Sequence, residues 1–248
     1  MAILFISDLH LCEARPQINA LFTRFVEELA RDAESLYILG DLFEYWIGDD
    51  QLDHDPLARR VAALLAKMAG RGTRIFFMHG NRDFLIGERF ATEAQLTLLP
   101  DPSLIMPGAR QIVLMHGDTL CTDDFAYQQF RAQVRDPLWQ AEILAKPYAE
   151  RAELAQSIRS RSDVEKLLKA DAIMDVNTTA VAETFEKYAF PVMIHGHTHR
   201  PARHELTVNG HVCTRWVLQD WHDRGGYLSA GGPDNVLSAH TFLAAGTP

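Results

Sequence analysis

The sequence contains few cysteines and fewer basic than acidic side chains. Its three cysteines, Cys12, Cys121 and Cys213, are odd in number and include no C-x-x-C pair, so the sequence predicts neither a disulfide framework nor a structural zinc site. Lys and Arg number 24 against 33 Asp and Glu, which leaves a net charge of -9. A surface of this sign argues against a nucleic-acid partner and against electrostatic binding to anionic lipid. Any contact with a membrane surface is therefore expected to be hydrophobic.

The chain also lacks a long uncharged apolar stretch. No run approaches the ~20 residues of a membrane-spanning helix. The apolar residues 1–6 are followed by Asp8, His10 and Glu13, which is too early for a secretory signal. The sequence has no internal repeat and no low-complexity tract. With 248 residues, 47% of them hydrophobic, it predicts a cytoplasmic globular monomer built as one large domain with room for an insertion.

Five short apolar runs each lead into a residue that can bind a metal ion. The runs cover residues 3–6, 36–39, 75–78, 112–115 and 192–194. The metal-binding side chains that follow them are Asp8, His10, Asp41, Asn81, His116, His195 and His197. Short apolar runs beside glycine predict buried strands, and α/β sheets gather ligands just beyond the carboxyl ends of their strands. The sequence therefore predicts that these side chains converge on a site for two metal ions.

The ligand types narrow the choice of metal. Carboxylate, imidazole and amide oxygen without thiolate suit Mn, Fe, Zn or a similar divalent ion. Two neighbouring ions need a shared anionic ligand, and we predict Asp41 as this bridge because it directly follows its own strand. Gly40, Gly80, Gly117 and Gly196 stand next to ligands, where glycine lets the backbone turn sharply without crowding the ions.

The spacing of apolar residues predicts the order of the elements. Helical spacing between the first strands indicates strand–helix–strand units with mostly parallel pairing. Residues 122–188 show no strand pattern and predict an inserted helical cap, in which a capping box starts one helix at Ser162. After about residue 202, paired turn residues between alternating runs predict antiparallel hairpins. These pairs are Asn209-Gly210, Gly225-Gly226 and Gly231-Gly232.

The metal-binding motifs stand in a fixed order along the chain: Asp8-x-His10, Gly40-Asp41, Gly80-Asn81, His116 and Gly196-His197. In this order they resemble the calcineurin-like metallophosphoesterases. The resemblance implies an α/β fold of the αββα sandwich type, with a core of residues 1–121 and 189–248 and a helical cap of residues 122–188. It implies one ion on Asp8, His10, Asp41 and His197, and a second ion on Asp41, Asn81, His116 and His195. His199 is expected beside these ligands as a supporting residue.

Arg82 follows Asn81 at a position where many members of that superfamily carry His. His can protonate a leaving oxygen there, whereas Arg cannot and instead offers a charged fork for a second phosphate oxygen. A phosphate leaving group is stable as an anion near neutral pH and needs little protonation. Arg82 therefore favours cleavage of a diphosphate over cleavage of a phosphomonoester. The alternative for Arg82 is a structural ion pair with Asp83 or another carboxylate.

Longer segments surround the motifs, at residues 6–11, 40–50, 80–84, 116–124 and 195–201. They closely resemble the bacterial UDP-2,3-diacylglucosamine hydrolases of lipid A biosynthesis. The resemblance implies hydrolysis of the diphosphate of UDP-2,3-diacylglucosamine to UMP and 2,3-diacylglucosamine 1-phosphate (lipid X), with two Mn²⁺ ions. Because this substrate is a lipid, we expect the cap to attach the protein peripherally to the cytoplasmic face of the bacterial inner membrane.

The predicted cap contains side chains that suit an anionic lipid. It is rich in apolar residues, and its basic residues from Arg159 to Lys169 outnumber the acidic residues between them. The alternative is that the apolar residues form the cap's own small core and the charges a solvated face. The resemblance implies a catalytic set of Asp41, Asn81, Arg82 and His197. It implies substrate contacts at Asn81, Arg82, Asp124, Tyr127, Arg159, Ser162, Lys166, Lys169 and His197.

Two other functions stay open from the sequence. One is a phosphodiesterase or phosphatase of the same superfamily, and both Arg82 and the helical insertion count against it. The other is a non-catalytic scaffold on the same fold, and the complete set of ligands counts against it.

Overall fold

The computed structural model describes residues 2–168, 175–189, 191–232 and 235–243, with side chains for all of these except residues 160–168. It contains two β-sheets, and the first has the strand order β11-β10-β1-β2-β3-β4. Strands β1 to β4 run parallel, and β10 and β11 are added antiparallel at the β1 edge. The strands are β1 Ile3–Ile6, β2 Ser35–Ile38, β3 Arg74–Met78, β4 Leu96–Leu99, β10 Gly225–Gly231 and β11 Val236–Phe242.

The second sheet has the strand order β5-β6-β7-β9-β8. Its central strands β6, β7 and β9 run parallel, and both edge strands are antiparallel to their neighbours. The strands are β5 Ser103–Ile105, β6 Ile112–Leu114, β7 Val192–His195, β8 Ala202–Val208 and β9 His211–Val217.

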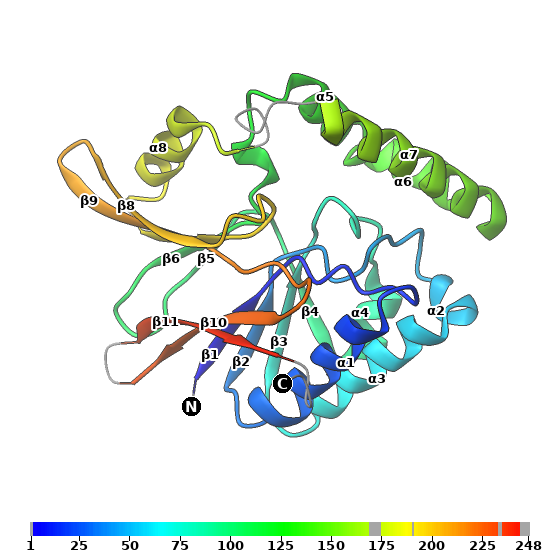
Figure 1. The fold of residues 1–248 in the computed structure, drawn as a ribbon, viewed down its shortest axis with the longest axis horizontal. Coiled ribbons are helices and arrows are strands. Elements are labelled where there is room, and N and C mark those ends of the chain that lie inside the picture. The colour runs from blue at the N-terminus through cyan, green and yellow to red at the C-terminus, as the bar shows by residue number, and fades with distance from the viewer. Residues whose placement is uncertain (1, 169–174, 190, 233–234, 244–248) are drawn as a thin grey trace.

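Alternation along the strands places apolar side chains on both faces of each sheet. In β1, Leu4 and Ile6 pack toward the helices, whereas Ile3 and Phe5 pack between the sheets. In β6, Ile112 faces the first sheet and Val113 faces the opposite side. Three buried clusters therefore separate four layers, which confirms the predicted αββα sandwich (Figure 1).

Helices cover both outer faces of the sandwich. The first sheet is covered by α1 Pro16–Arg24 with its π-helical continuation Phe25–Leu29, α2 Gln51–His54, α3 Pro56–Ala69 and α4 Glu88–Ala94. The second sheet is covered by α8 Thr178–Lys187, whose Val181 and Phe185 are buried against it.

Three further helices lie above the ends of the strands (Figure 1): α5 Phe125–Val134, α6 Pro137–Leu144 and α7 Tyr148–Leu168. A short 3₁₀ turn at Asp118–Leu120 leads into them. The helix start predicted at Ser162 is wrong, because α7 continues through this position from Tyr148. The structure also separates α8 from the predicted cap, since α8 packs on the second sheet; the cap consists of α5 to α7.

The C-terminal hairpins are confirmed, with one difference in their turns. Asn209 and Gly210 connect β8 to β9, both with positive φ of 48° and 81°, as a two-residue hairpin loop requires. Gly225 and Gly231 are instead the end residues of β10. A Cβ atom on Gly225 would lie 2.3 Å from the Phe242 ring, so this glycine serves packing rather than a turn.

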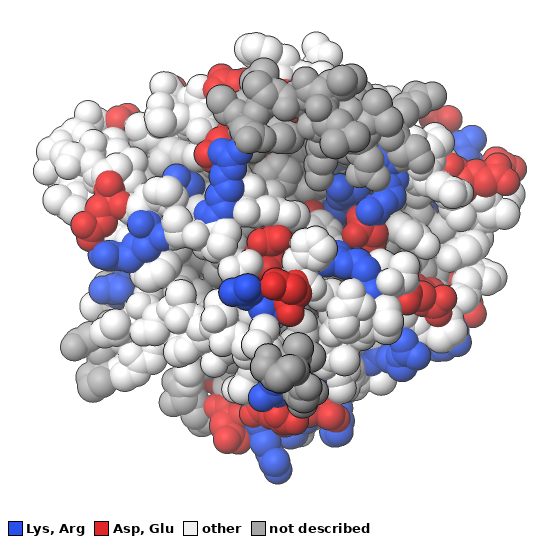
Figure 2. All heavy atoms as spheres, in the orientation of Figure 1, with Lys and Arg blue, Asp and Glu red and all other residues white. Residues whose placement is uncertain are grey.

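Within the part of the chain that the structure describes, no helix is long and apolar enough to cross a membrane. On the face drawn in Figure 2, basic and acidic side chains are interspersed among uncharged ones.

Candidate metal centre

Loops after five strands bring the candidate ligands together where the two sheets face each other. Asp8 and His10 follow β1, Asp41 follows β2, and Asn81 follows β3. His116 follows β6, and His197 and His199 follow β7. These side chains come from both sheets, so the site depends on how the two sheets pack.

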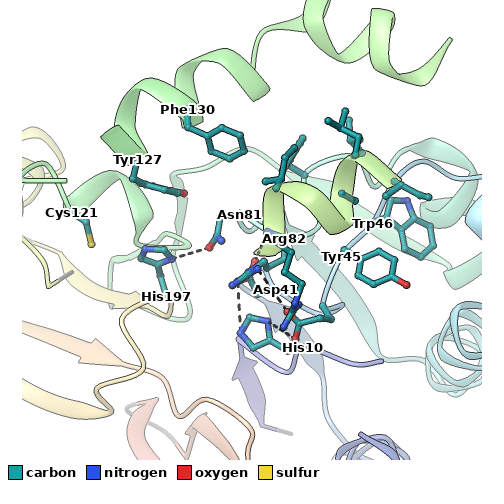
Figure 3. Close-up of a pocket in the computed structure, with 18 of the residues that line it drawn as sticks. His10, Asp41, Tyr45, Trp46, Asn81, Arg82, Cys121, Tyr127, Phe130 and His197 are labelled. Carbon is teal, nitrogen blue, oxygen red and sulfur yellow. Dashed lines mark hydrogen bonds and ion pairs between the residues drawn. The ribbon is translucent and has the colours of Figure 1, made fainter. Parts of the chain in front are cut away.

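The first half of the site is centred on Asn81. Its Oδ1 atom lies 3.0 Å from Nε2 of His116 and 3.0 Å from Nδ1 of His197. Nε2 of His116 lies 3.9 Å from Oδ1 of Asp41. Figure 3 shows Asn81 and His197 facing each other among the residues that line a pocket.

The second half of the site contains Asp8, His10 and His199. Nε2 of His10 lies 3.3 Å from Nε2 of His199, and Nε2 of His199 lies 3.5 Å from Oδ1 of Asp8. Nε2 of His10 is 3.9 Å from Oδ2 of Asp41. Asp41 thus presents one oxygen to each half, the position that a bridging ligand requires.

The donor set fits divalent cations. Ligand atoms of Asp8, His10 and His199 lie within 4.8 Å of one another, and so do those of Asp8, Asp41 and His116. Among the described residues, the buried Oδ1 atom of Asp8 and the buried Nδ1 atom of His10 have no hydrogen-bond partner. A buried carboxylate oxygen without a partner is costly unless a cation satisfies it.

His195 does not join this cluster. Its Nδ1 lies 2.8 Å from the carbonyl oxygen of Gly196, and its Nε2 accepts from Nη1 of Arg215 at 2.9 Å. Both ring nitrogens are therefore engaged. Burial, followed by the charge of Arg215, lowers the pKa of His195 to about 4, so the ring is neutral and can accept from the guanidinium. His199, expected only as a supporting residue, occupies the place beside His10.

The backbone at the site adopts an unusual conformation. Five candidate ligands have positive φ, a region that non-glycine residues seldom occupy and that costs about 1 kcal/mol or more each. They are Asp8 (56°), His10 (50°), Asp41 (54°), His197 (67°) and His199 (53°). His195 does not have a positive φ.

Two of the predicted glycines allow the close approach of these loops. A Cβ atom on Gly80 would lie 2.1 Å from Oδ1 of Asp41. A Cβ atom on Gly196 would lie 2.2 Å from Oδ2 of Asp8. No other residue type fits at either position without moving a carboxylate of the site.

Asp83 links the loop after β2 to the loop after β3, a role that no sequence motif indicated. Its fully buried carboxylate accepts from the backbone N–H groups of Leu42 at 2.7 Å and Gly80 at 2.9 Å, and lies 3.3 Å from that of Asp41. Burial, followed by the charge of Asp41, raises the pKa of Asp83 to about 6. The alternative expected for Arg82 is an ion pair with Asp83 or another carboxylate, and the structure shows the second form, with Nη1 of Arg82 3.8 Å from Oε1 of Glu44.

Burial and charge set the protonation of the imidazoles. Burial lowers the pKa of His10 well below its ordinary value. Burial, followed by the charge of His116, lowers the pKa of His197 to about 3. Both rings are therefore neutral near pH 7 and have lone pairs to offer a cation.

The nearby carboxylates raise, rather than lower, the pKa of the His116 ring. Burial alone lowers the pKa of this ring, but Asp41, Asp118 and Asp8 raise it to about 9. Burial alone raises the pKa of Asp8, but His199, whose Nε2 lies 3.5 Å from Oδ1 of Asp8, holds it well below its ordinary value. The carboxylates thus favour a positive charge in this part of the centre, on His116 or on a bound cation.

A cavity of about 570 Å³ joins the centre to the cap. One end contains His10, Asp41, Asn81, Arg82 and His197. The apolar part is lined from the cap by Phe130, Trp139, Ile143, Leu154 and Ile158, and from the core by Tyr45, Trp46, Ile47, Phe84 and Leu85. Figure 3 shows Tyr127 and Phe130 pointing from α5 into this space.

The predicted substrate contacts are placed unequally. Asp124, Tyr127 and Arg159 line the cavity. Asp124 also caps α5 by accepting from Tyr127 N at 3.1 Å, and the Tyr127 hydroxyl donates to Asp118 at 2.7 Å. The Ser162 and Lys166 side chains, and all of Lys169, lie outside the described residues.

Comparison with known proteins agrees with this geometry. A family model described as calcineurin-like phosphoesterase matches residues 1–201. The UDP-2,3-diacylglucosamine hydrolase of Aromatoleum aromaticum is 52% identical over 239 residues, 96% of this chain and 97% of that protein. Those of Chromohalobacter salexigens and Shigella dysenteriae are 50% and 49% identical, over 92% and 98% of this chain and 92% and 100% of their own lengths. The chain therefore belongs to the calcineurin-like phosphoesterase family, within its group of UDP-2,3-diacylglucosamine hydrolases.

Proposed function

We propose that this protein hydrolyses the diphosphate bond of UDP-2,3-diacylglucosamine, yielding UMP and 2,3-diacylglucosamine 1-phosphate for lipid A biosynthesis. The observation that carries the proposal is one continuous cavity, which is lined by Arg82 and the metal centre and extends into an apolar space beneath the cap. A substrate with a diphosphate at one end and two acyl chains at the other matches both parts of this cavity. The names of the relatives support the same substrate.

The proposed cofactor is a pair of divalent ions, most suitably Mn²⁺. One ion is assigned to Asp8, His10, Asp41 and His199, and the other to Asp41, Asn81, His116 and His197. Relative to the sequence prediction, His199 takes the place of His197 at the first ion, and His197 takes the place of His195 at the second ion. It leaves out His195, because both of its ring nitrogens are engaged elsewhere.

The ions supply Lewis acidity, which activates water and offsets phosphate charge. The chain positions the diphosphate: Arg82 offers N–H donors to phosphate oxygens, and its Nε is buried without a partner among the described residues. Neutral His197 and the amide of Asn81 line the same cavity, and we assign them contacts with the phosphoryl group. Water attacks the phosphorus nearest uridine as its bond to the bridging oxygen breaks.

No general acid is required for the departing group. It leaves as a sugar phosphate, which is an anion near neutral pH, and Arg82 balances its charge without giving up a proton. Asp124, Tyr127, Arg159, Ser162, Lys166 and Lys169 remain the proposed contacts to the rest of the substrate. The apolar lining from Trp46, Trp139 and Ile158 receives acyl chains.

The cap is also the proposed contact with the inner membrane. Phe125 at the start of α5 is 75% exposed, and Leu138 at the start of α6 is 81% exposed. Exposed large apolar side chains suit insertion among lipid headgroups, and the net charge of -9 leaves hydrophobic contact as the driving force.

The test is release of UMP from UDP-2,3-diacylglucosamine by the metal-loaded protein, with bis-p-nitrophenyl phosphate as the comparison. We expect cleavage of the lipid substrate with far higher kcat/KM. Cleavage of the generic diester alone would contradict the proposal and favour a general phosphodiesterase. Inactivity on both with metal bound would favour a scaffold.

Arg82→Ala separates substrate chemistry from metal binding. Because Arg82 contacts phosphate rather than the ions, kcat should fall by roughly a hundredfold, as for other groups that neutralise transition-state charge. Elemental analysis should show an unchanged metal content. Loss of metal in this variant would contradict the role proposed for Arg82.

A further inference from the structure

Glu44 lies at the border between the metal centre and the cap, and no motif identified it. Its side chain is largely buried and lines the cavity. Oε1 of Glu44 lies 3.8 Å from Nη1 of Arg82 and directly contacts Nη1 of Arg159. Oε2 lies 3.9 Å from Nη1 of Arg15 and 4.0 Å from Nδ1 of His10. One carboxylate thus faces three guanidinium groups and an imidazole.

The three arginines come from separate parts of the chain. Arg82 follows β3 and Arg159 belongs to α7 of the cap, whereas Arg15 precedes α1. Arg15 is held in place because its Nη2 donates to the carbonyl oxygen of Trp221 at 2.6 Å. Guanidinium groups this close repel one another, and a carboxylate between them offsets that repulsion.

The remaining charge favours an anionic ligand. Three guanidinium groups against one carboxylate leave the border region positive, although the whole protein carries a charge of -9. A guanidinium has five N–H donors, so Arg82 and Arg159 can face Glu44 and still donate to phosphate. Nε of Arg82 is buried without a partner among the described residues, which leaves a donor for such a ligand.

Building on the proposed function, we propose that Glu44 is a positioning residue that gathers Arg82 of the core and Arg159 of the cap into one site for the substrate diphosphate. Through Arg159 it also joins α7 to the metal centre. A substrate that reaches the cap therefore depends on Glu44 through both arginines, whereas a small diester that occupies only the metal centre depends on it through Arg82 alone.

The test measures KM, kcat and metal content for Glu44→Gln, Arg159→Gln and the double variant. Each single change should raise KM for UDP-2,3-diacylglucosamine about tenfold, and the double variant should raise it by less than the product of the two single effects, because residues that act together are not additive. KM for bis-p-nitrophenyl phosphate should rise less than KM for the lipid substrate, and the metal content should stay unchanged. Glu153→Gln, at an exposed position of α7, is the matched control.

Several results would overturn this inference. Effects of the two single changes that multiply in the double variant would show that Glu44 does not act through Arg159. Loss of metal in Glu44→Gln would show that Glu44 serves His10 instead. An equal rise of KM for both substrates would indicate a general disturbance of the site.

Hydrogen exchange of the substrate-free protein tests the inference independently of the proposed function. Backbone amides of residues 148–159 should exchange faster in Glu44→Gln than in the wild type, because α7 loses one of its contacts with the core. Unchanged exchange would contradict the role of Glu44. Failure of the wild type to release UMP would contradict the proposed function, while the exchange comparison would still decide on Glu44.

Discussion

At the scale of single residues, the metal centre is assembled on strained backbone. Asp8, His10, Asp41, His197 and His199 all have positive φ, and such strain persists where the surrounding structure over-determines it. Here Asp83 fixes the backbone after β2 and β3, and the hydrogen bond from His197 N to Asp8 at 2.9 Å fixes the loop after β7. This backbone conformation points the side chains at one another.

The histidines of the β7 loop give a direct prediction. His199→Ala should lower metal affinity roughly tenfold or more, since a ligand should matter at least as much as its supporting groups. His195→Gln should keep both ions and lose stability instead, because Gln does not fill the buried place of the ring between Arg215 and Gly196. Metal titration by calorimetry, together with urea unfolding, measures both effects.

The reverse pattern would contradict this ligand assignment. If His195→Gln loses metal and His199→Ala retains it, the assignment from the sequence holds.

The residue pattern allowed most of this site to be predicted, for a physical reason. Strand ends are visible in the sequence as apolar runs that stop at glycine or a polar residue, and six of the seven predicted ligands lie in the cluster. His195 could not be excluded in this way, because its partner Arg215 lies on β9 and the pairing of β7 with β9 is invisible in one sequence. The positive φ of His199 is likewise a tertiary feature.

At the scale of elements, the cap is attached to the core through buried polar contacts. Asp118, just after the His116 loop, accepts from Tyr127 and Arg131 of α5. Arg135, the residue after α5, donates to the carbonyl oxygen of Gly80 at 2.8 Å, directly before Asn81. The helices that line the apolar space therefore also support the loops that hold the ligands.

A second attachment joins α7 to the loop after β2. The buried Arg151 contacts the carbonyl oxygen of Ile47 and the carboxylate of Asp50, and donates to the carbonyl oxygen of Lys146 at 3.0 Å. A Cβ atom on Gly48 would lie 2.2 Å from Nη1 of Arg151. Gly48 is thus the position at which a small change should detach α7.

Gly48→Ala should therefore destabilise the protein and raise KM for the lipid substrate. Gly72→Ala is the control, because both glycines have positive φ, 134° and 101°, but nothing lies within 4 Å of a Cβ at Gly72. We expect Gly48→Ala to cost about 1–3 kcal/mol more than Gly72→Ala in urea unfolding, the usual cost of overpacking. Equal costs would show that Arg151 does not depend on this space.

The elements differ in how well the sequence predicts them. The buried strands β1, β2, β3, β6 and β7 were predicted from their apolar runs, whereas β4 and β5 were missed because their side chains are mostly only half-buried. The capping-box pattern at Ser162 predicts a helix start, but α7 starts at Tyr148 and runs through this position. Whether a helix packs on the sheet or the cap, as with α8, depends on contacts that spacing does not encode.

At the scale of the whole molecule, the metal centre and the cap lie at the same end of the sandwich, beyond the ends of the strands. The exposed Phe125 and Leu138 lie on α5 and α6, two of the helices above the ends of the strands (Figure 1). Under the proposed function, this arrangement would let a lipid pass from a membrane surface into the apolar space while its diphosphate reaches the metal centre.

The membrane contact can be measured with vesicles of phosphatidylethanolamine and phosphatidylglycerol. The pair Phe125→Ser and Leu138→Ser should weaken sedimentation with vesicles roughly tenfold, because two apolar side chains no longer insert. The pair Met106→Ser and Val212→Ser is the control, since these side chains are 65% and 76% exposed but lie outside the cap. Binding that disappears at high salt and ignores Phe125 and Leu138 would show an electrostatic contact instead.

The central claim is that the ions perform the hydrolysis while the apolar cavity under the cap selects the substrate. The most direct measurement is the ratio of kcat/KM for UDP-2,3-diacylglucosamine to kcat/KM for the same nucleotide sugar without acyl chains. Two buried acyl chains contribute many CH₂ groups at about 0.8 kcal/mol each, so we predict a ratio of roughly a thousandfold or more. Equal values for the two substrates would contradict the claim.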